Sequence, residues 1–141
     1  MGSEMCIRDR DTDQVCLSFS VGQPNSEQTW LFIIALLAIA PQEGKRVVVI
    51  IWDNATWHKS QRLRSWIHLY NQAAKQAGEP RLITHLLPLK SPWLNPMEPI
   101  WLHAKRKVVE PDGDLSVKVL KERLCAHFQT TLERATLKVS A

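Results

Sequence analysis

Two carboxylates stand where a metal-dependent enzyme would need them. Asp53 ends the most apolar run of the chain, which begins at Val47, and Glu98 lies in the first turn of a helix introduced by Asn95 and Pro96. Carboxylates are hard oxygen ligands that suit Mg²⁺ or Mn²⁺, ions that also coordinate water and phosphate oxygens. In a two-metal displacement such ions activate the attacking oxygen and stabilise the leaving one. If the two carboxylates meet, they indicate part of a phosphoryl-transfer enzyme.

The elements around these residues explain how they could meet. Residues 47–52 are apolar on both faces, which predicts a central, parallel strand. An amphipathic helix follows, and residues 82–87 form the next predicted strand. In a parallel strand-helix-strand unit both carboxyl ends lie at one sheet edge, where α/β proteins bind ligands. The loop of residues 88–93 turns at that edge, so we expect Glu98 to emerge near Asp53.

The other segments complete an α/β pattern. Two helices are bounded by recognisable signals, since Ser60 is a typical N-cap, Gly78 a typical C-cap, and Ser116 or Asp114 a typical start for the last helix. The predicted order is a strand at 15–21, a helix ending near Ala40, a strand at 47–52, a helix to Gly78, a strand at 82–87, a helix after Asn95 whose apolar face runs from Met97 to Val108, and a helix to Phe128.

The two ends of the chain differ from this core. Residues 1–14 have no apolar periodicity and six charged residues, which predicts disorder. Residues 1–10 also look foreign to the rest of the chain, in the manner of a translated cloning or sequencing linker. We therefore predict a non-native lead at 1–14, a core at 15–128 and a C-terminal tail at 129–141.

Composition narrows the function classes. Residues 1–29 hold two bases against five acids, whereas the remainder holds sixteen bases against nine acids, which favours a polyanionic partner. The three scattered cysteines include no C-x-x-C pair, which argues against a disulfide framework or a zinc ribbon and fits a reducing cytosol. The apolar run at 30–40 is about half the ~20 residues that span a bilayer, and Pro41 stops it, so a buried helix is the better interpretation.

Both carboxylates also have purely structural interpretations. Asp53 followed by Asn54 is common turn chemistry after a strand. Glu98 stands where a capping box places its acid, with Asn95 as N-cap and Pro96 at the first helical position. Spacing does not choose between these roles and metal binding, although no structural rule requires both residues in this relation.

The remaining candidates carry weaker signals. His58 could contact a phosphate or orient its loop, and Trp93 could stack on a base, whereas Trp101 fits the apolar stripe of its helix. A basic run and one loop lysine could face phosphates, although such runs are usually solvated surfaces. These four residues are Lys90, Lys105, Arg106 and Lys107.

Two motifs carry a resemblance to a known family. D-N-A-x-W-H occupies 53–58, and L-P-x-x-S-P-x-L-N-P-x-E occupies 87–98. Over about residues 15–128 the chain resembles the DDE-type transposases of bacterial insertion sequences related to mariner elements. The resemblance implies a ribonuclease-H-like mixed sheet with flanking helices, Mg²⁺-dependent DNA cleavage and strand transfer, and action in the bacterial cytoplasm on transposon ends and target DNA, with a possible homodimer in the full-length enzyme.

By this resemblance Asp53 corresponds to the second catalytic aspartate and Glu98 to the final acid. Asn54 and His58 support the first motif, and Asn95 and Pro96 support the second. The family also needs a first aspartate on the opening strand and a helix-turn-helix region, and no residue here is assigned to either. We therefore expect the C-terminal part of such an enzyme, with incomplete N-terminal strands, an exposed sheet edge and little cleavage on its own.

A second function class stays open beside the transposase interpretation. It is a non-catalytic DNA-binding or oligomerisation module that uses the same basic surface. Binding of that kind would depend on the basic run and fall steeply with salt, whereas metal-dependent chemistry would depend on the two carboxylates.

Overall fold

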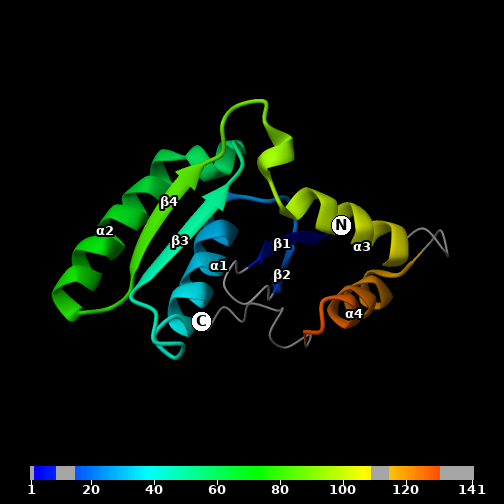
Figure 1. The fold of residues 1–141 in the computed structure, drawn as a ribbon, viewed down its shortest axis with the longest axis horizontal. Coiled ribbons are helices and arrows are strands. Elements are labelled where there is room, and N and C mark those ends of the chain that lie inside the picture. Colours follow the sequence, from blue (N-terminus) through cyan, green and yellow to red (C-terminus); the bar gives the residue numbers. More distant parts are fainter. Residues whose placement is uncertain (1, 9–14, 109–114, 131–141) are drawn as a thin grey trace. The chain divides into compact units, whose positions relative to one another are not determined.

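The computed structural model describes residues 2–8, 15–108 and 115–130 of the chain (Figure 1). They form two compact units, one of residues 24–95 and one of the residues up to 23 together with those from 96 onward. The elements are β1 (Gly2–Arg8), β2 (Val15–Val21), α1 (Ser26–Ile39), β3 (Val47–Trp52), the 3₁₀ turn η1 (Thr56–Lys59), α2 (Gln61–Ala77), β4 (Arg81–Leu86), η2 (Pro92–Leu94), α3 (Met97–Val108) and α4 (Val117–His127).

A parallel strand pair forms the centre of the 24–95 unit. β3 pairs with β4 in a continuous register that runs from Val47 opposite Arg81 to Trp52 opposite Leu86. The bond from Leu87 N–H to the carbonyl of Trp52, at 2.8 Å, extends this pairing one residue past β4. The predicted strand-helix-strand unit is therefore present, and the carboxyl ends of β3 and β4 lie at the same sheet edge (Figure 1).

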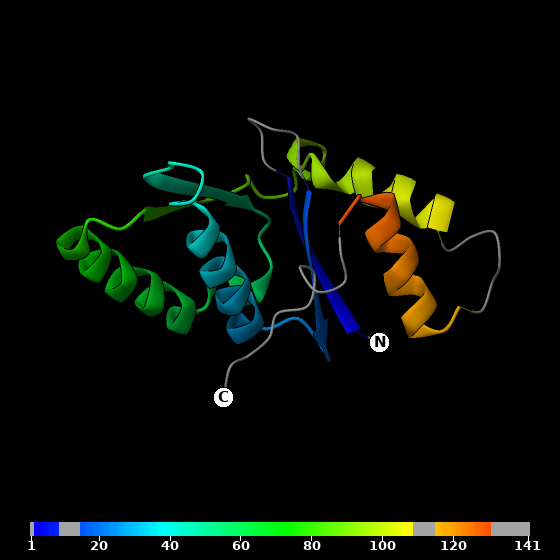
Figure 2. The same ribbon diagram turned by 90° about the horizontal axis from the view of Figure 1, so that it is seen from below.

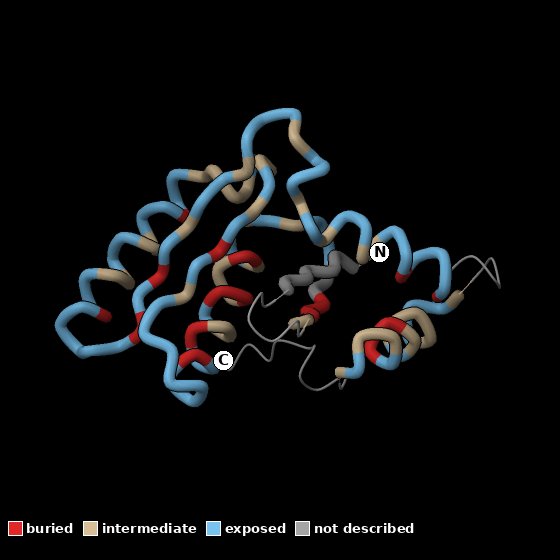
Figure 3. The backbone as a smooth tube through the Cα atoms, viewed as in Figure 1, coloured by how far each residue is buried: buried red, intermediate tan, exposed pale blue. Residues whose placement is uncertain are grey.

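Both helices of this unit lie on one face of the β3–β4 sheet (Figure 2). Two side chains of the face that they cover are buried, with Ile50 exposing 3% and Leu82 2% of their surface. Along β3 and β4, exposed residues alternate with buried and intermediate ones (Figure 3), and the opposite face carries exposed apolar side chains. Its apolar members are Val47, Val49, Ile51 and Ile83, each 42–55% exposed.

Helix α2 begins and ends as its sequence predicts. Ser60 is the N-cap, since its hydroxyl accepts a hydrogen bond from Leu63 N–H, and Gly78 ends the helix in the left-handed conformation at φ 72°. Glycine adopts this conformation without the steric cost that a Cβ would add. Leu63 and Ala74 are buried on the face that the periodicity selects.

Helix α1 is apolar around most of its circumference. Asn25 caps it by accepting from Gln28 N–H at 2.9 Å, and Phe32, Ile33 and Leu37 are among its buried residues. Trp30 packs against Trp66 and Tyr70 of α2, with ring centroids 5.9 and 6.1 Å apart. Among the described residues, no helix combines the length and the apolar character that crossing a bilayer requires.

The other unit contains an antiparallel pair that the sequence pattern does not predict. Strand β1 pairs with β2 from Gly2 opposite Val21 to Arg8 opposite Val15. Residues 2–8 are a strand in the structure, where the sequence pattern predicts a disordered lead, and residues 9–14 lie outside the described part. Strand pairing satisfies backbone N–H and C=O groups whatever the side chains are, so a segment without apolar periodicity can still form a strand.

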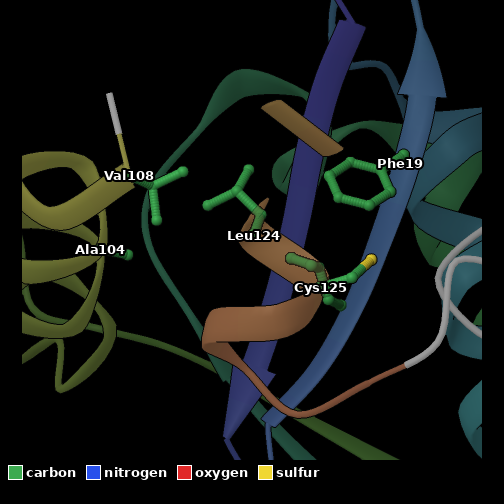
Figure 4. Packing of buried hydrophobic residues seen from close by; sticks show 6 residues of the cluster. Phe19, Ala104, Val108, Leu124 and Cys125 are labelled. Carbon is green, nitrogen blue, oxygen red and sulfur yellow. The ribbon is translucent and has the colours of Figure 1, made fainter. Parts of the chain in front are cut away.

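The core of this unit forms between β2, α3 and α4 (Figure 4). Trp101 packs against this core and meets Phe128 edge-to-face at 5.7 Å, which confirms its packing role. Burial raises the pKa of the Cys125 thiol, so this cysteine acts as a small apolar residue. The buried members are Leu17, Phe19, Ala104, Val108, Leu124 and Cys125.

The structure shows how helices α3 and α4 begin. Ser116 caps α4 by accepting from Val119 N–H, and Val117, the first residue of the helix, is 53% exposed. Helix α3 begins at Met97, and the N–H of Asn95 instead bonds to the Pro92 carbonyl at 2.9 Å and closes η2. Helix α3 thus begins two residues after Asn95, and the N-cap interpretation of this residue stays a prediction.

Candidate functional site

Asp53 is the first residue after β3, at the carboxyl edge of the parallel pair. Its Oδ1 accepts from Ala55 N–H at 3.0 Å, which forms a tight turn directly after the strand. The side chain is 58% exposed. The turn role expected for this aspartate is therefore real, and it uses one of the two carboxylate oxygens.

His58 contacts the same oxygen. Its Nδ1 lies 2.9 Å from Asp53 Oδ1 and 3.4 Å from the Asp53 backbone oxygen. The imidazole stacks on Trp52, with centroids 4.7 Å apart and planes 9° from parallel, and Trp57 meets it edge-on at 5.8 Å. The histidine of the first motif is thus 17% exposed and packed beside the aspartate.

Asn54 connects the loop that follows β3 to the chain that follows β4. Its Nδ2 donates to the Leu87 carbonyl, directly before the Pro88 of the second motif. This bond joins the two motifs at one sheet edge, which gives Asn54 a specific supporting role.

A serine anchors the same loop from α1. Ser26 Oγ donates to the Trp57 carbonyl at 3.1 Å and lies 2.7 Å from Ser60 Oγ, the cap of α2. The loop of residues 53–60 is therefore held at both ends by hydrogen bonds. Sequence reasoning missed Ser26, and no pattern within the motif points to it.

The loop after β4 presents apolar and basic side chains to solvent. Leu89 is 72% and Trp93 76% exposed, and Lys90 is exposed with a backbone φ of 55°. Pro92 starts η2, and Asn95 ends it. This segment leaves the same sheet edge that displays Asp53.

Glu98 and the basic run belong to the other unit. Glu98 is exposed in the first turn of α3, where a negative charge interacts favourably with the helix dipole. Lys105, Arg106 and Lys107 are exposed in the last turn, where positive charges do the same. Because Asp53 and Glu98 lie in separately described units, their meeting remains a prediction.

The donor chemistry around Asp53 fits a hard divalent cation in part. A carboxylate oxygen at an exposed sheet edge is a suitable ligand for Mg²⁺ or Mn²⁺. Within the described ranges, however, no three His, Cys, Asp or Glu side chains gather into a metal-binding group. Most positions around an ion bound here would therefore fall to water or to phosphate oxygens.

The comparisons with known proteins decide the family. A family model described as DDE superfamily endonuclease matches residues 5–114, which is well over half of the chain. This chain belongs to the DDE superfamily endonucleases. The match spans β1 from residue 5 through α3, so it includes part of the segment that the sequence pattern sets apart as a non-native lead. No curated protein and no solved structure matches the chain.

Family membership and fold agree. The DDE superfamily has a ribonuclease-H-like core, and this chain has the α/β composition of that class, with both parallel and antiparallel strand pairs. The family acts as endonucleases, which implies a DNA substrate and divalent-metal chemistry in general terms.

Proposed function

We propose that this DDE superfamily endonuclease chain forms part of the catalytic core of an insertion-sequence transposase related to the mariner type. Asp53 and Glu98 would be its metal ligands, and DNA cleavage and strand transfer would be its reaction. The observation that carries this proposal is the position of Asp53 at the carboxyl edge of β3, hydrogen-bonded to the histidine of its own motif. The second motif leaves β4 at the same edge and leads into Glu98.

A bound Mg²⁺ would activate the attacking oxygen and stabilise the charge that develops on the transferred phosphate. The chain's own contribution is to hold the ligands still. The bond from Asn54 to Leu87 and the anchoring of the loop by Ser26 fix Asp53 at the sheet edge. A fixed carboxylate does not have to be ordered when the ion binds, so its metal affinity rises.

The chain alone should cleave DNA poorly. The resemblance assigns two carboxylates, and such enzymes use three, so water must fill more of the coordination sphere here. We expect little or no nicking of a supercoiled plasmid in Mg²⁺. Robust Mg²⁺-dependent nicking that Asp53→Asn abolishes would overturn this inactivity.

Metal binding provides the direct test of the proposed site. Mn²⁺ titrated into the full ¹⁵N-labelled chain should broaden the amide signals near Asp53 and near Glu98 in parallel. Asp53→Asn and Glu98→Gln should each weaken binding at both places. Glu43→Gln and Glu122→Gln remove exposed carboxylates from the same two units and should leave binding unchanged. Independent Mn²⁺ effects at the two positions would contradict a shared site.

A second candidate function rests on the exposed cations of α3. Lys105, Arg106 and Lys107 form an unbroken basic run in the last helical turn. If the chain is a non-catalytic DNA-binding module, replacing all three with Ser should weaken binding uniformly across sequences. The slope of log affinity against log salt should fall by about 1 for each lost phosphate contact. Asp53→Asn would leave or strengthen binding in that case.

A further inference from the structure

The contacts of His58 go beyond those of a surface histidine in a motif. A carboxylate can only accept hydrogen bonds, so the 2.9 Å contact between His58 Nδ1 and Asp53 Oδ1 requires the proton to be on Nδ1. The Ala55 N–H donates to the same oxygen at 3.0 Å. Two donors therefore converge on Oδ1.

We propose that His58 is a positioning residue that orients the Asp53 carboxylate and makes Oδ2 the metal-facing oxygen. This inference rests on the proposed function, because it assigns the ligand atom of that site. An oxygen has two lone pairs, and the two N–H groups use both of those on Oδ1. Asp53 would then bind the ion through one oxygen rather than through both.

Stacking holds the histidine in place. The His58 ring lies parallel to Trp52, the last residue of β3, and Trp57 closes one edge. Rotation of the imidazole away from Asp53 would break this stack. The exposed carboxylate is therefore held through a half-buried tryptophan of the strand that carries it.

The proton on His58 Nδ1 also determines whether the neutral ring could donate a hydrogen bond to a phosphate. In neutral imidazole one nitrogen donates and the other accepts, so a proton on Nδ1 leaves Nε2 as an acceptor. An acceptor cannot bind a phosphate oxygen. The geometry therefore favours positioning of Asp53 over direct phosphate binding by neutral His58.

The hydrogen bond can be tested without metal or activity. Long-range ¹H–¹⁵N correlation spectra of the full chain report which imidazole nitrogen carries a proton, and His58→Asn identifies the signals. We expect a protonated Nδ1 in His58, and Asp53→Ala should shift the proton population toward Nε2. An unprotonated Nδ1 in the unaltered chain would overturn the assignment.

The effect on the metal ligand needs variants that separate the ring from its N–H. His58→Phe keeps the ring against Trp52 but removes the donor, whereas His58→Asn can supply an N–H near the position of Nδ1. Loss of such an outer contact lowers metal affinity by about tenfold or more. We expect that loss of Mn²⁺ affinity in His58→Phe, and His58→Asn should recover much of the affinity. The control His68→Phe, which changes an exposed histidine, should lose no Mn²⁺ affinity.

The metal site at Asp53 and the positioning role of His58 are overturned by different results. Equal Mn²⁺ affinity in the unaltered chain and in His58→Phe would overturn the positioning role while leaving the metal site intact. If Mn²⁺ broadens no signals, or broadens them equally in Asp53→Ala, the metal site is overturned, and the positioning role is overturned with it. The Nδ1 proton would still show in that case whether the bond itself exists.

Discussion

At the residue scale, the turn role of Asp53 and its proposed metal-binding role do not compete. One oxygen closes the turn with Ala55 and receives the N–H of His58, and the other is left for a ligand. The same residue can therefore satisfy the structural interpretation of an aspartate after a strand and the metal-binding one. The spacing of the sequence cannot separate these roles because both need a carboxylate at this position.

Asn54 offers a prediction about the connection between the motifs. Asn54→Ala removes the bond to the Leu87 carbonyl and should lower the free energy of unfolding by about 1 kcal/mol. Asn54→Asp has nearly the same shape but places a carboxylate oxygen against that carbonyl, so it should cost more than Ala. Urea unfolding measures both, with exposed Gln61→Ala as the control. An Asp variant as stable as the unaltered chain would contradict the assigned bond.

The motif predicts which residues belong to the loop but not how they are held. D-N-A-x-W-H places Asp53, Asn54 and His58 in one segment, and the structure describes them together. Neither the stacking of Trp52 on His58 nor the anchor from Ser26 can be read from spacing. Both depend on side-chain conformations that only the packed elements select.

At the element scale, the edge of β4 is closed by one side chain of α2. Asn71 Nδ2 donates to the Leu82 carbonyl at 2.8 Å, and its Oδ1 accepts from Leu82 N–H at 2.9 Å. These two bonds satisfy the backbone of a strand whose other side pairs with β3. The helix is thereby joined to the sheet by backbone groups as well as by apolar packing.

Asn71→Ala should therefore destabilise the 24–95 unit more than a surface change would. Each backbone group left without a partner costs about 1–3 kcal/mol when it is buried, and Leu82 is buried. The neighbouring exposed Gln72→Ala is the control and should stay within about 0.5 kcal/mol. Denaturant unfolding gives both values, and similar losses in the two variants would argue against edge closure.

A pair of histidines joins α3 to α4 and predicts a pH effect. Burial first, and then the nearby His103 and Lys107, lower the pKa of His127 below its ordinary value of 6.5. Unfolding restores the higher pKa, so the unfolded chain binds more protons within this window. The stabilising contribution is therefore complete above pH 6.5 and is lost as the pH falls toward the lowered value.

Thermal melting across that pH range tests the effect. The melting temperature should fall with pH below 6.5 in the unaltered chain, and His127→Gln should flatten the fall. His85→Gln changes an exposed histidine of β4 and should not. An unchanged pH profile in His127→Gln would show that the titration lies elsewhere.

Element boundaries show where sequence patterns suffice. The 3.6-residue period and the caps at Ser60 and Gly78 locate α2, because both signals are local. Strand β1 escapes prediction because its order comes from pairing with β2 rather than from its own side chains.

At the scale of the whole molecule, the net charge and the exposed apolar surface have opposite effects on self-association. The net charge of +4 opposes self-association, whereas the apolar face of β3–β4 promotes it. The apolar run of β3 predicts a strand buried on both faces, and the structure describes burial on one face only. A sequence pattern records what a strand can bury, but not which partner covers it.

Adjacent residues on the two faces of β3 separate these effects. Val49 is 55% exposed and Ile50 3% exposed, so the same change to Thr has opposite meanings at the two positions. Val49→Thr keeps a β-branched side chain in the strand and makes the exposed face more polar. It should raise the protein concentration at which light scattering detects aggregates, with stability changed by about 0.5 kcal/mol or less.

Ile50→Thr should instead lower the protein concentration at which aggregates appear. It places a hydroxyl on the buried face and removes apolar contacts, which costs about 1–3 kcal/mol and promotes aggregation through unfolding. If Val49→Thr leaves the aggregation threshold unchanged while Ile50→Thr lowers it, self-association depends on unfolding alone. The exposed face of the sheet then does not contribute to self-association, and the net charge of the chain suffices to keep folded molecules from associating.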